Sequence, residues 1–328
     1  MIPEAKKAAV ARALHEAFGV TEFENMRILT AGLSSALVFR IVVKGRPYLL
    51  RVITRTDAIN DPIRQFACMK SGAEAGLAPR IWYTSIEERF SITDFVEAHP
   101  FPITKALVGL PVTLRTLHAL PPFPKTVNYL DAMAGFIHKL HAAKILPESE
   151  TGELVQLHER VMSVYPRHSD MVSCHNDLKS ENVLFDSDRA WLVDWEAAFL
   201  NDRYLDLSIV ANFVIVTEAD EELYLRTYFG QAPSPYQLAR FYLMRQILHM
   251  SYAAVFFLIG AAGKPVEPDA NVLSFRDFND RIWFGEISLA PADAKLQYAR
   301  VHLNQLFENV RAARFQDALR IVQIGASR

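Results

Sequence analysis

Three oxygen-bearing side chains near the middle of the chain have the types and the spacing that phosphoryl transfer requires. Asp177 is followed five residues later by Asn182, and Asp194 ends the apolar run 191–193. In such a set one carboxylate accepts or orients the proton of an attacking hydroxyl, while the other oxygens hold magnesium against the phosphates. The pattern therefore predicts magnesium-dependent phosphoryl transfer to a hydroxyl group.

The neighbouring residues argue against a chance match. Asp and Asn are ordinary turn residues, so this pair carries little weight by itself. Here His175 precedes Asp177 by two residues, and the apolar residues 183–185 follow Asn182. His-x-Asp-x4-Asn followed by a later Asp is the form of a kinase catalytic loop. We expect His175 to order the backbone of the catalytic group, while Lys179 either steadies the transferring phosphoryl group or points to solvent.

Two longer segments carry a family resemblance. HNDLKSENVL, residues 175–184, and LVDWEAAFLNDRYLDLS, residues 192–208, resemble the catalytic and metal-binding segments of the aminoglycoside phosphotransferase and choline kinase superfamily. LHALPPFP, residues 117–124, is similar to a segment of bacterial members. The resemblance runs from about Leu29 to the C-terminal helices. His-Asn-Asp in place of His-Gly-Asp, and Glu196 after Asp-Trp, bring the chain closer to the choline and ethanolamine kinase side.

This resemblance implies a fold, two cofactors and a set of roles. The fold is the α+β, two-lobed, protein-kinase-like one, with a small antiparallel-sheet lobe and a larger, mostly helical lobe. The cofactors are ATP and Mg2+, with Asp177 as catalytic base and with Asn182 and Asp194 as magnesium ligands. Asp206 matches an acid that braces the catalytic loop through backbone hydrogen bonds, although a carboxylate favoured at a helix N-terminus is an equal explanation.

The expected phosphate-covering loop lies upstream, between two strand patterns. Gly32 permits close approach of backbone N–H groups to a nucleotide, and the hydroxyls of Ser34 and Ser35 can donate to phosphate. Taken alone, the segment that contains these residues is equally typical of a plain hairpin turn. Its place before the catalytic segment favours the phosphate-binding interpretation.

The strand after this loop carries Arg51 where protein kinases carry Lys. A cation is needed there to pair with the α- and β-phosphates, and Arg is a fork of donors suited to phosphate. The next helix normally supplies a Glu to this cation, but that place holds Gln65. Either a neutral contact replaces the ion pair, or another acid such as Asp61 or Glu74 serves.

Residues 93–97 match a hinge between two lobes. We expect Asp94, Phe95 and Val96 to bind the adenine edge through backbone groups. The identity of their side chains therefore gives little information about nucleotide binding. Phe95 is interpreted as core or hinge packing rather than as a stacking partner.

The acceptor site is the part that the sequence determines least. A quaternary ammonium would need an aromatic cage, and Tyr252 and Trp283, with Glu196, are the candidate acceptor residues. Aromatic residues at helical spacing more often belong to the core. Ala197 stands where choline kinases commonly have an aromatic residue, which argues against choline. The acidic run 218–222 is either a rim for aminoglycosides or an ordinary helix start.

Positioning these residues requires two kinds of element. Up to about residue 96 the patterns predict an N-terminal helix and then a small antiparallel sheet that carries one helix. After Pro100 the patterns are mostly helical, apart from a short loop–strand–turn–strand stretch over 171–196. We therefore expect a nucleotide-binding lobe over 1–96, a hinge at about 93–100, and a catalytic and acceptor-binding lobe over 97–328.

Composition narrows the functional class and the location. The net charge of −2 gives no overall basic field for nucleic acid, and the two cysteines fit no metal-ligand spacing. The apolar stretch 250–262 has about a dozen residues, too few for a bilayer, which needs roughly 20. We expect a cytoplasmic protein that binds neither nucleic acid nor membrane, and we interpret this stretch as a buried helix.

Three functions remain in competition at this point. The first is an ATP- and Mg2+-dependent kinase of the choline kinase type, acting on a hydroxyl of a small molecule. The second is an aminoglycoside phosphotransferase, and the third is a nucleotide-binding pseudokinase that acts as an interaction module. No segment resembles the Ala-Pro-Glu region of protein kinases, which disfavours a protein substrate. The oligomeric state and the acceptor stay open.

Overall fold

The computed structural model describes residues 2–29, 36–57, 60–266 and 272–326. The chain divides into two compact units. Unit 1 comprises Met1–Pro100 and Asn182–Ala198, and unit 2 comprises Phe101–Glu181 and Phe199–Arg328. Unit 1 contains an antiparallel sheet and unit 2 is mostly helical, so the predicted α+β class is confirmed.

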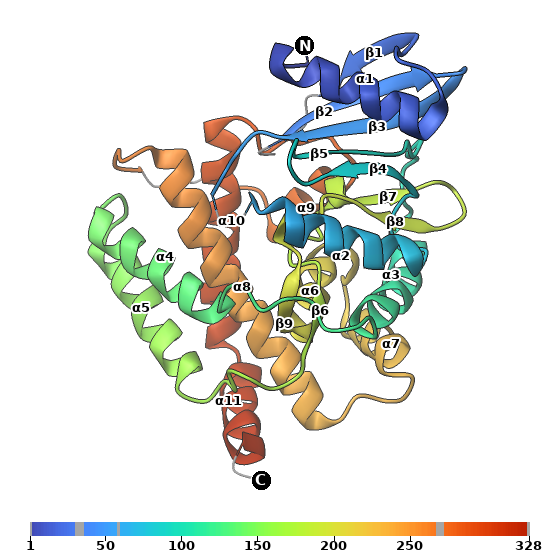
Figure 1. Cartoon of the computed structure of the whole chain (residues 1–328). Coiled ribbons are helices and arrows are strands. Elements are labelled where there is room, and N and C mark those ends of the chain that lie inside the picture. The colour runs from blue at the N-terminus through green and yellow to red at the C-terminus, as the bar shows by residue number, and fades with distance from the viewer. Residues whose placement is uncertain (1, 30–35, 58–59, 267–271, 327–328) are drawn as a thin grey trace. The chain divides into compact units, whose positions relative to one another are not determined.

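The sheet of unit 1 has five antiparallel strands in the order β1-β2-β3-β5-β4 (Figure 1). Between β2 and β3 the chain turns at Lys44 and Gly45, whose φ angles of 51° and 72° are both left-handed, as a tight two-residue hairpin requires. Although the sequence of residues 44–47 is typical of a turn, strand β3 already starts at Arg46, directly after Gly45. The strands are β1 (Asn25–Ile28), β2 (Ala36–Val43), β3 (Arg46–Ile53), β4 (Ile81–Ser85) and β5 (Phe90–Asp94).

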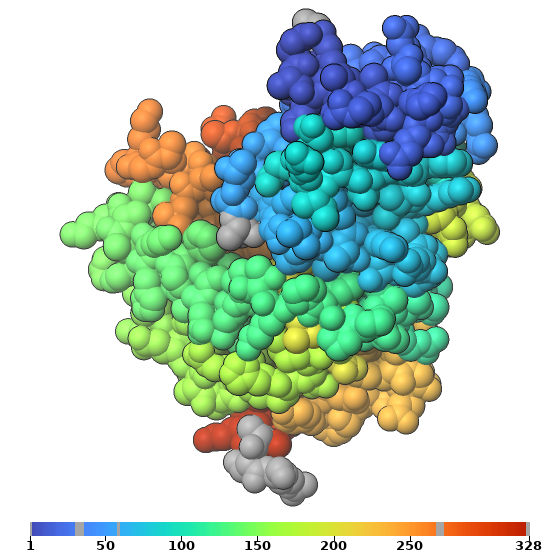
Figure 2. Space-filling model, viewed as in Figure 1, coloured from blue at the N-terminus to red at the C-terminus, as the bar shows by residue number. Residues whose placement is uncertain are grey.

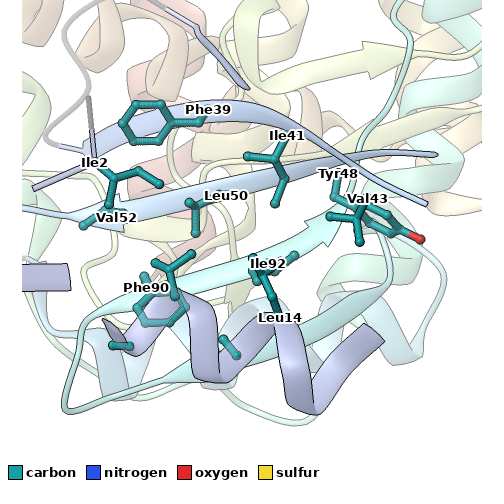
Figure 3. Close-up of a cluster of buried hydrophobic side chains, with 13 residues drawn as sticks. Ile2, Leu14, Phe39, Ile41, Val43, Tyr48, Leu50, Val52, Phe90 and Ile92 are labelled. Carbon is teal, nitrogen blue, oxygen red and sulfur yellow. The ribbon is translucent and has the colours of Figure 1, made fainter. Parts of the chain in front are cut away.

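Helix α1 (Glu4–Phe18) covers one face of this sheet and forms a core with it. Residues at alternate positions of a strand point to the same face, which explains why Phe39 and Ile41 are buried together with Leu50. Figure 3 shows these side chains gathered over α1, with Leu14 beside Ile92. Arg51 lies on the opposite face of β3, together with Leu49 and Ile53.

Helix α2 (Pro62–Glu74) and a short hairpin complete unit 1. Asp61 caps the helix by accepting from the Ile63 amide at 3.0 Å, and Pro62 occupies the first helical position. The hairpin consists of β7 (Val183–Phe185) and β8 (Ala190–Leu192) and is followed by the 3-10 turn η3 (Trp195–Ala197). The Leu192 amide donates to the Leu77 carbonyl at 2.8 Å, which ties the hairpin to the segment after α2.

Unit 2 is built around helix α8, with a two-stranded sheet of β6 and β9 beside α6. Residues 291–324 form one continuous helical pattern in the sequence but fold as two helices, because Ala312 adopts extended backbone between them. Figure 2 shows α4 and α5 in green on the surface of this unit. The elements are α3 (Ile103–His118), α4 (Tyr129–Ala143), α5 (Glu148–Met162), β6 (Met171–Cys174), η2 (Ser180–Asn182, which reaches into unit 1), β9 (Phe199–Asp202), α6 (Arg203–Val214), α7 (Glu218–Phe229), α8 (Pro235–Ala261), α9 (Phe275–Trp283), α10 (Ala292–Arg311) and α11 (Ala313–Ala326).

Helix α8 corrects one sequence argument and confirms another. With 27 residues it extends well beyond the apolar stretch 250–262, so the argument that the stretch is too short to span a bilayer was wrong. Among the described helices it is the one with the length and composition for such a span, but 67% of its apolar window is buried inside the protein. The prediction of a buried helix is confirmed, since α10, α11, α4 and α6 pack around it (Figure 1).

Candidate functional site

In unit 1 the side chain of Arg51 is surrounded by acceptors. It lies on β3 and donates to Asp194 Oδ1 at 2.6 Å and to Glu196 Oε2 at 2.9 Å. Its other terminal nitrogen donates to Gln65 Oε1 at 3.3 Å. Only 13% of the Arg51 side chain is exposed, so these charge-assisted hydrogen bonds hold it in one place.

These contacts decide between the alternatives left open for the partner of Arg51. Asp61 is occupied as the cap of α2, and Glu74 pairs with Lys70 at 3.9 Å. The helix therefore contributes the neutral Gln65, and the negative charge comes from residues after β8. Glu196, named from the sequence as an acceptor residue, lies beside Arg51 in unit 1.

Asn182 and Asp194 lie at the same end of the β7–β8 hairpin. The Val193 amide donates to the Asn182 carbonyl at 3.0 Å, directly beyond the last ladder pair of Val183 and Leu192. Asp194 has a left-handed backbone with φ 64°, a conformation that Asp tolerates better than most residues. With Glu196 these residues offer amide and carboxylate oxygens, the ligands that Mg2+ prefers, so the donor set fits this ion.

Helix α2 holds the segment that carries both acids. The Arg64 guanidinium donates to the carbonyls of Ala198 at 2.6 Å and Glu196 at 2.7 Å. The Trp195 ring packs against Gly72, where an added Cβ would lie 2.5 Å from ring atoms. The sequence reasoning missed both residues of α2, although a glycine inside a helical pattern is a signal of close packing.

The predicted catalytic loop belongs to unit 2 and follows β6. Asp206, in the first turn of α6, accepts from the His175 amide at 2.8 Å and from the Asn176 amide at 2.7 Å. Both explanations offered for this acid hold, because it lies at a helix N-terminus and also braces the loop. Asn176 has a left-handed φ of 65°, which explains why Asn stands where Gly is the alternative. His175 is completely buried, so an ordering role for it stays our prediction.

Asp177 and Lys179 project from this braced loop. The Lys179 ammonium lies 3.3 Å from Asp177 Oδ2, and the two side chains are 32% and 30% exposed. Asp177 is thus accessible on a loop whose preceding backbone is fixed. Both open roles of Lys179 are compatible with this contact.

The segment LHALPPFP bonds to β6, which leads into the predicted catalytic loop, and to β9, which pairs with β6. Ser173 in β6 accepts from the Phe123 amide at 3.0 Å and donates to the Pro121 carbonyl at 2.8 Å. The Leu200 amide in β9 donates to the Pro124 carbonyl at 3.1 Å. The segment is therefore a hydrogen-bond partner of both strands in the β6–β9 sheet.

An aromatic cluster of unit 2 includes one of the two aromatic acceptor candidates. Tyr252 lies 5.9 Å from Phe256 and 5.8 Å from Tyr298, measured between ring centroids, and His302 makes edge contacts with both tyrosines. Burial, with a contribution from the charge of Asp177, raises the pKa of Tyr252 and of Tyr298 well above the usual range. Both rings therefore stay neutral and lie within electrostatic reach of Asp177.

The other candidates have different surroundings. Trp283 donates to the Phe101 carbonyl at 2.8 Å, and its ring packs on Phe101 and Phe213. In the acidic run, Asp220 forms the capping box of α7, and Glu221 is buried between Arg245 and Arg314. These contacts favour a structural explanation of the run over an acidic rim.

The predicted hinge and phosphate loop are described only in part. Asp94 ends β5 and accepts from the Trp82 indole at 2.7 Å, while Arg40 lies 5.2 Å from the centroid of the Phe95 ring. Val96 follows in irregular backbone. Gly32, Ser34 and Ser35 lie outside the described residues.

Comparison with known proteins gives a family match and similar solved structures. Residues 25–242 match the model of a family described as the phosphotransferase enzyme family. A choline/ethanolamine kinase family protein from Mesorhizobium loti is 20% identical, with a TM-score of 0.69 over 97% of this chain and 99% of that one. A spectinomycin phosphotransferase is 14% identical, with a TM-score of 0.56 over 90% of this chain and 97% of that one.

Curated relatives match over a shorter stretch. Protein LicA from Haemophilus influenzae is 36% identical over 58 residues, which are 18% of this chain and 22% of that protein. The chain matches between 15% and 22% of the length of its curated relatives. Together the comparisons confirm the superfamily that the sequence resembles and its two-lobed, kinase-like fold class.

Proposed function

Because the chain belongs to the phosphotransferase enzyme family, we propose that it is an ATP- and Mg2+-dependent kinase that transfers the γ-phosphoryl group to a hydroxyl of a small molecule. The observation that carries this proposal is the grouping of Arg51 with Asp194 and Glu196 at the end of the β7–β8 hairpin. A fork of donors beside oxygen ligands is what a metal-bound triphosphate needs.

The residues of unit 1 divide the work of nucleotide binding. Arg51 pairs with the α- and β-phosphates, and the oxygens of Asn182 and Asp194 hold the magnesium ion. When bound, Mg2+ neutralises charge on the phosphate oxygens. Glu196 keeps the Arg51 fork oriented in this half of the site. Backbone groups of residues 94–96 bind the adenine edge. Gly32, Ser34 and Ser35, outside the described residues, stay the predicted phosphate-binding residues.

The residues of unit 2 supply the proton chemistry. Asp177 accepts the proton of the attacking hydroxyl, as a positioned carboxylate can when its backbone is held in place. Asp206 provides this positioning through the amides of His175 and Asn176. Lys179 offsets the negative charge that accumulates during transfer. This chemistry needs groups of both units, since Asp177 belongs to unit 2 while Asn182 and Asp194 belong to unit 1.

For the acceptor we favour an amino alcohol of the choline or ethanolamine kind. The neutral rings of Tyr252 and Tyr298 lie within electrostatic reach of Asp177, and a quaternary or primary ammonium gains from aromatic faces. The acidic run that an aminoglycoside would need is engaged in capping and ion pairs of α7. Ala197 remains the residue that argues for an acceptor other than choline.

An assay of ADP production by the full-length chain with Mg-ATP tests the proposal. Choline, ethanolamine and thiamine form one group of acceptors and a set of aminoglycosides, including spectinomycin, forms the other, with an acceptor-free reaction as the blank. Turnover confined to the first group supports a kinase for amino alcohols, and turnover confined to the second supports an aminoglycoside phosphotransferase. Mg-ATP binding without turnover on either group would favour a pseudokinase. Gln65, which stands where active kinases normally have Glu, is the residue that raises this hypothesis.

We further propose a cytoplasmic location and partners limited to small molecules. The apolar window of α8 is 67% buried by other helices of unit 2, which accounts for its hydrophobicity without a bilayer. The net charge of −2 provides no attraction for nucleic acid.

A further inference from the structure

His118, in the last turn of α3, connects Tyr228 of α7 to Asp206 of α6, the acid that braces the predicted catalytic loop. Its Nε2 lies 3.2 Å from Asp206 Oδ2, and its Nδ1 lies 2.7 Å from the hydroxyl of Tyr228 in α7. The side chains of His118 and Asp206 are 2% and 0% exposed, and Tyr228 is buried as well. Tyr228, His118 and Asp206, here called the relay, therefore form a chain of hydrogen bonds shielded from water.

The direction of the hydrogen bonds in the relay follows from its two ends. An ionised Asp206 only accepts, so Nε2 of His118 carries the hydrogen, and in a neutral imidazole Nδ1 is then an acceptor. The Tyr228 hydroxyl must donate to Nδ1, which leaves its oxygen free to accept. Burial raises the pKa of this hydroxyl well above its usual value, and the nearby charge of Arg203 opposes this effect. The tyrosine and the acid thus favour the same tautomer.

The same cluster resembles a metal site but lacks the chemistry of one. His118, Cys174 and Asp206 each offer a ligand atom, and these atoms lie within 4.8 Å of one another. Burial, and then the nearby carboxylates, raise the pKa of the Cys174 thiol well above its usual range, so no thiolate is available. The thiol instead bonds the Asn201 carbonyl at 3.5 Å, and each oxygen of Asp206 already accepts a backbone amide. Hydrogen bonding explains the cluster better than a metal does.

We propose that His118 is a positioning residue for phosphoryl transfer. Its Nε2–H fixes the Asp206 carboxylate, which fixes the amides of His175 and Asn176, and these directly precede Asp177 in the chain. Without this donor the carboxylate can rotate away from one of the two amides. This proposal rests on the proposed function only for the first of its two measurements, the rate of phosphoryl transfer.

Three variants and one matched control test the relay in the full-length chain. His118→Leu removes the donor to Asp206, whereas His118→Gln keeps an N–H donor at similar reach. Tyr228→Phe removes only the hydroxyl that holds the tautomer. Tyr224→Phe is the control, because Tyr224 is an equally buried tyrosine of α7 whose hydroxyl donates to the Leu207 carbonyl at 3.1 Å, outside the relay.

Turnover is the first measurement. We expect His118→Leu to lower kcat by roughly 10- to 100-fold, the usual cost of misplacing a reacting group, with the KM for ATP close to that of the unaltered chain. His118→Gln should recover most of this loss, Tyr228→Phe should fall between, and Tyr224→Phe should keep normal kcat. Equal losses in the Leu and Gln variants, or in the two Phe variants, would overturn the proposal.

Amide hydrogen exchange at residues 175–176 is the second measurement and needs no turnover. We expect faster exchange in His118→Leu and Tyr228→Phe than in Tyr224→Phe, because the Asp206 acceptor is less well held. If the unaltered chain phosphorylates no acceptor, the proposed function fails while this comparison still decides the role of His118. Unchanged exchange at these two amides in both relay variants would overturn that role.

Discussion

At the scale of single residues, the surroundings of Arg51 explain how the site tolerates Gln65. Two carboxylates, Asp194 and Glu196, already lie within 3 Å of the guanidinium, so the cation is paired without an acid from α2. The 2% exposed Gln65 adds an oxygen to this arrangement but no charge. A third buried acid would repel the other two and the phosphates that the site must accept.

The role of Asp177 can be separated from the role of Asp194 by substitution. We expect Asp177→Ala to lower the rate of phosphoryl transfer by about 10²- to 10⁴-fold, the usual contribution of a general base, while Mg-ATP binding is largely kept. Asp194→Ala should show the opposite order, with Mg-ATP binding itself impaired, because it removes a predicted ligand and a partner of Arg51. ADP release and calorimetric nucleotide titration measure both. Near-normal turnover of Asp177→Ala would show that another group is the base.

A substitution at Gln65 tests the argument about charge. Gln65→Glu is expected to weaken Mg-ATP binding on the order of tenfold, the equivalent of about 1.4 kcal/mol, because the added carboxylate competes with phosphate for Arg51. Gln65→Met, which keeps the size and adds no charge, is the matched control in the same titration. If Gln65→Glu bound Mg-ATP more tightly than the unaltered chain, an acid at this position of α2 would favour nucleotide binding, and the argument about charge would be refuted.

At the scale of elements, α2 acts as the support of the acids rather than as the source of one. Arg64 bonds the backbone of the segment 194–198, and Gly72 leaves the space that the Trp195 ring fills. Gly in a helix interior costs about 1 kcal/mol relative to Ala. The close approach of the indole gives a reason to keep glycine at this position.

Adding one methyl group to α2 should therefore disturb the site. We expect Gly72→Ala to lower the free energy of unfolding by about 1–3 kcal/mol, because overpacking against Trp195 outweighs the gain in helix propensity, and to weaken nucleotide binding as well. Gly135→Ala in α4 is the matched control, since nothing lies within 4 Å of an added Cβ there, and it should stabilise by about 0.5–1 kcal/mol. Urea unfolding measures both, and equal stabilisation of the two variants would refute the packing argument.

At the scale of the whole molecule, the chain passes between the two units at 100/101, 181/182 and 198/199. Asp177 therefore belongs to unit 2, while Asn182 and Asp194 belong to unit 1. The proposed chemistry needs groups from both units, whereas each half is held together within one unit. Where α8 packs against α10 in unit 2, two buried imidazoles lie together, with His249 Nδ1 2.9 Å from His302 Nδ1.

This buried pair predicts how stability depends on pH. Burial lowers the pKa of His302 to about 3 and the pKa of His249 well below the usual value of 6.5. Below pH 6.5 the unfolded imidazoles bind protons that the folded ones do not, so stability is present above this pH and is lost as the pH falls. At pH 5.5 each such group costs about 1.4 kcal/mol. Urea unfolding at pH 7.5 and 5.5 measures the loss.

Two variants provide the control for this dependence. His302→Asn should reduce the loss between pH 7.5 and 5.5, although His249 and His158, whose pKa is also lowered by burial, keep part of it. His168→Asn removes an exposed imidazole and should leave the loss unchanged. A folded chain equally stable at both pH values would contradict the predicted protonation states.

Much of this protein follows from local sequence. The spacing of Asp177, Asn182 and Asp194 and the strand and helix periodicities each depend on residues near one another in the chain. They sufficed to predict the α+β class, the superfamily and most elements, and they failed where one helical pattern hides a break, as at Ala312. Local periodicity reports which face of an element is apolar, and a break of one residue hardly changes it.

Only the tertiary structure decided which side chains meet. Arg51 and Asp194 are 143 residues apart, and His118 and Asp206 are 88 apart, so no local pattern could pair them. The choice of Glu196 over Asp61 or Glu74 depends on the path of the chain after β8. Hydrogen bonds and ion pairs act over a few ångströms in space, and it is the packing of distant segments that brings their partners within that range.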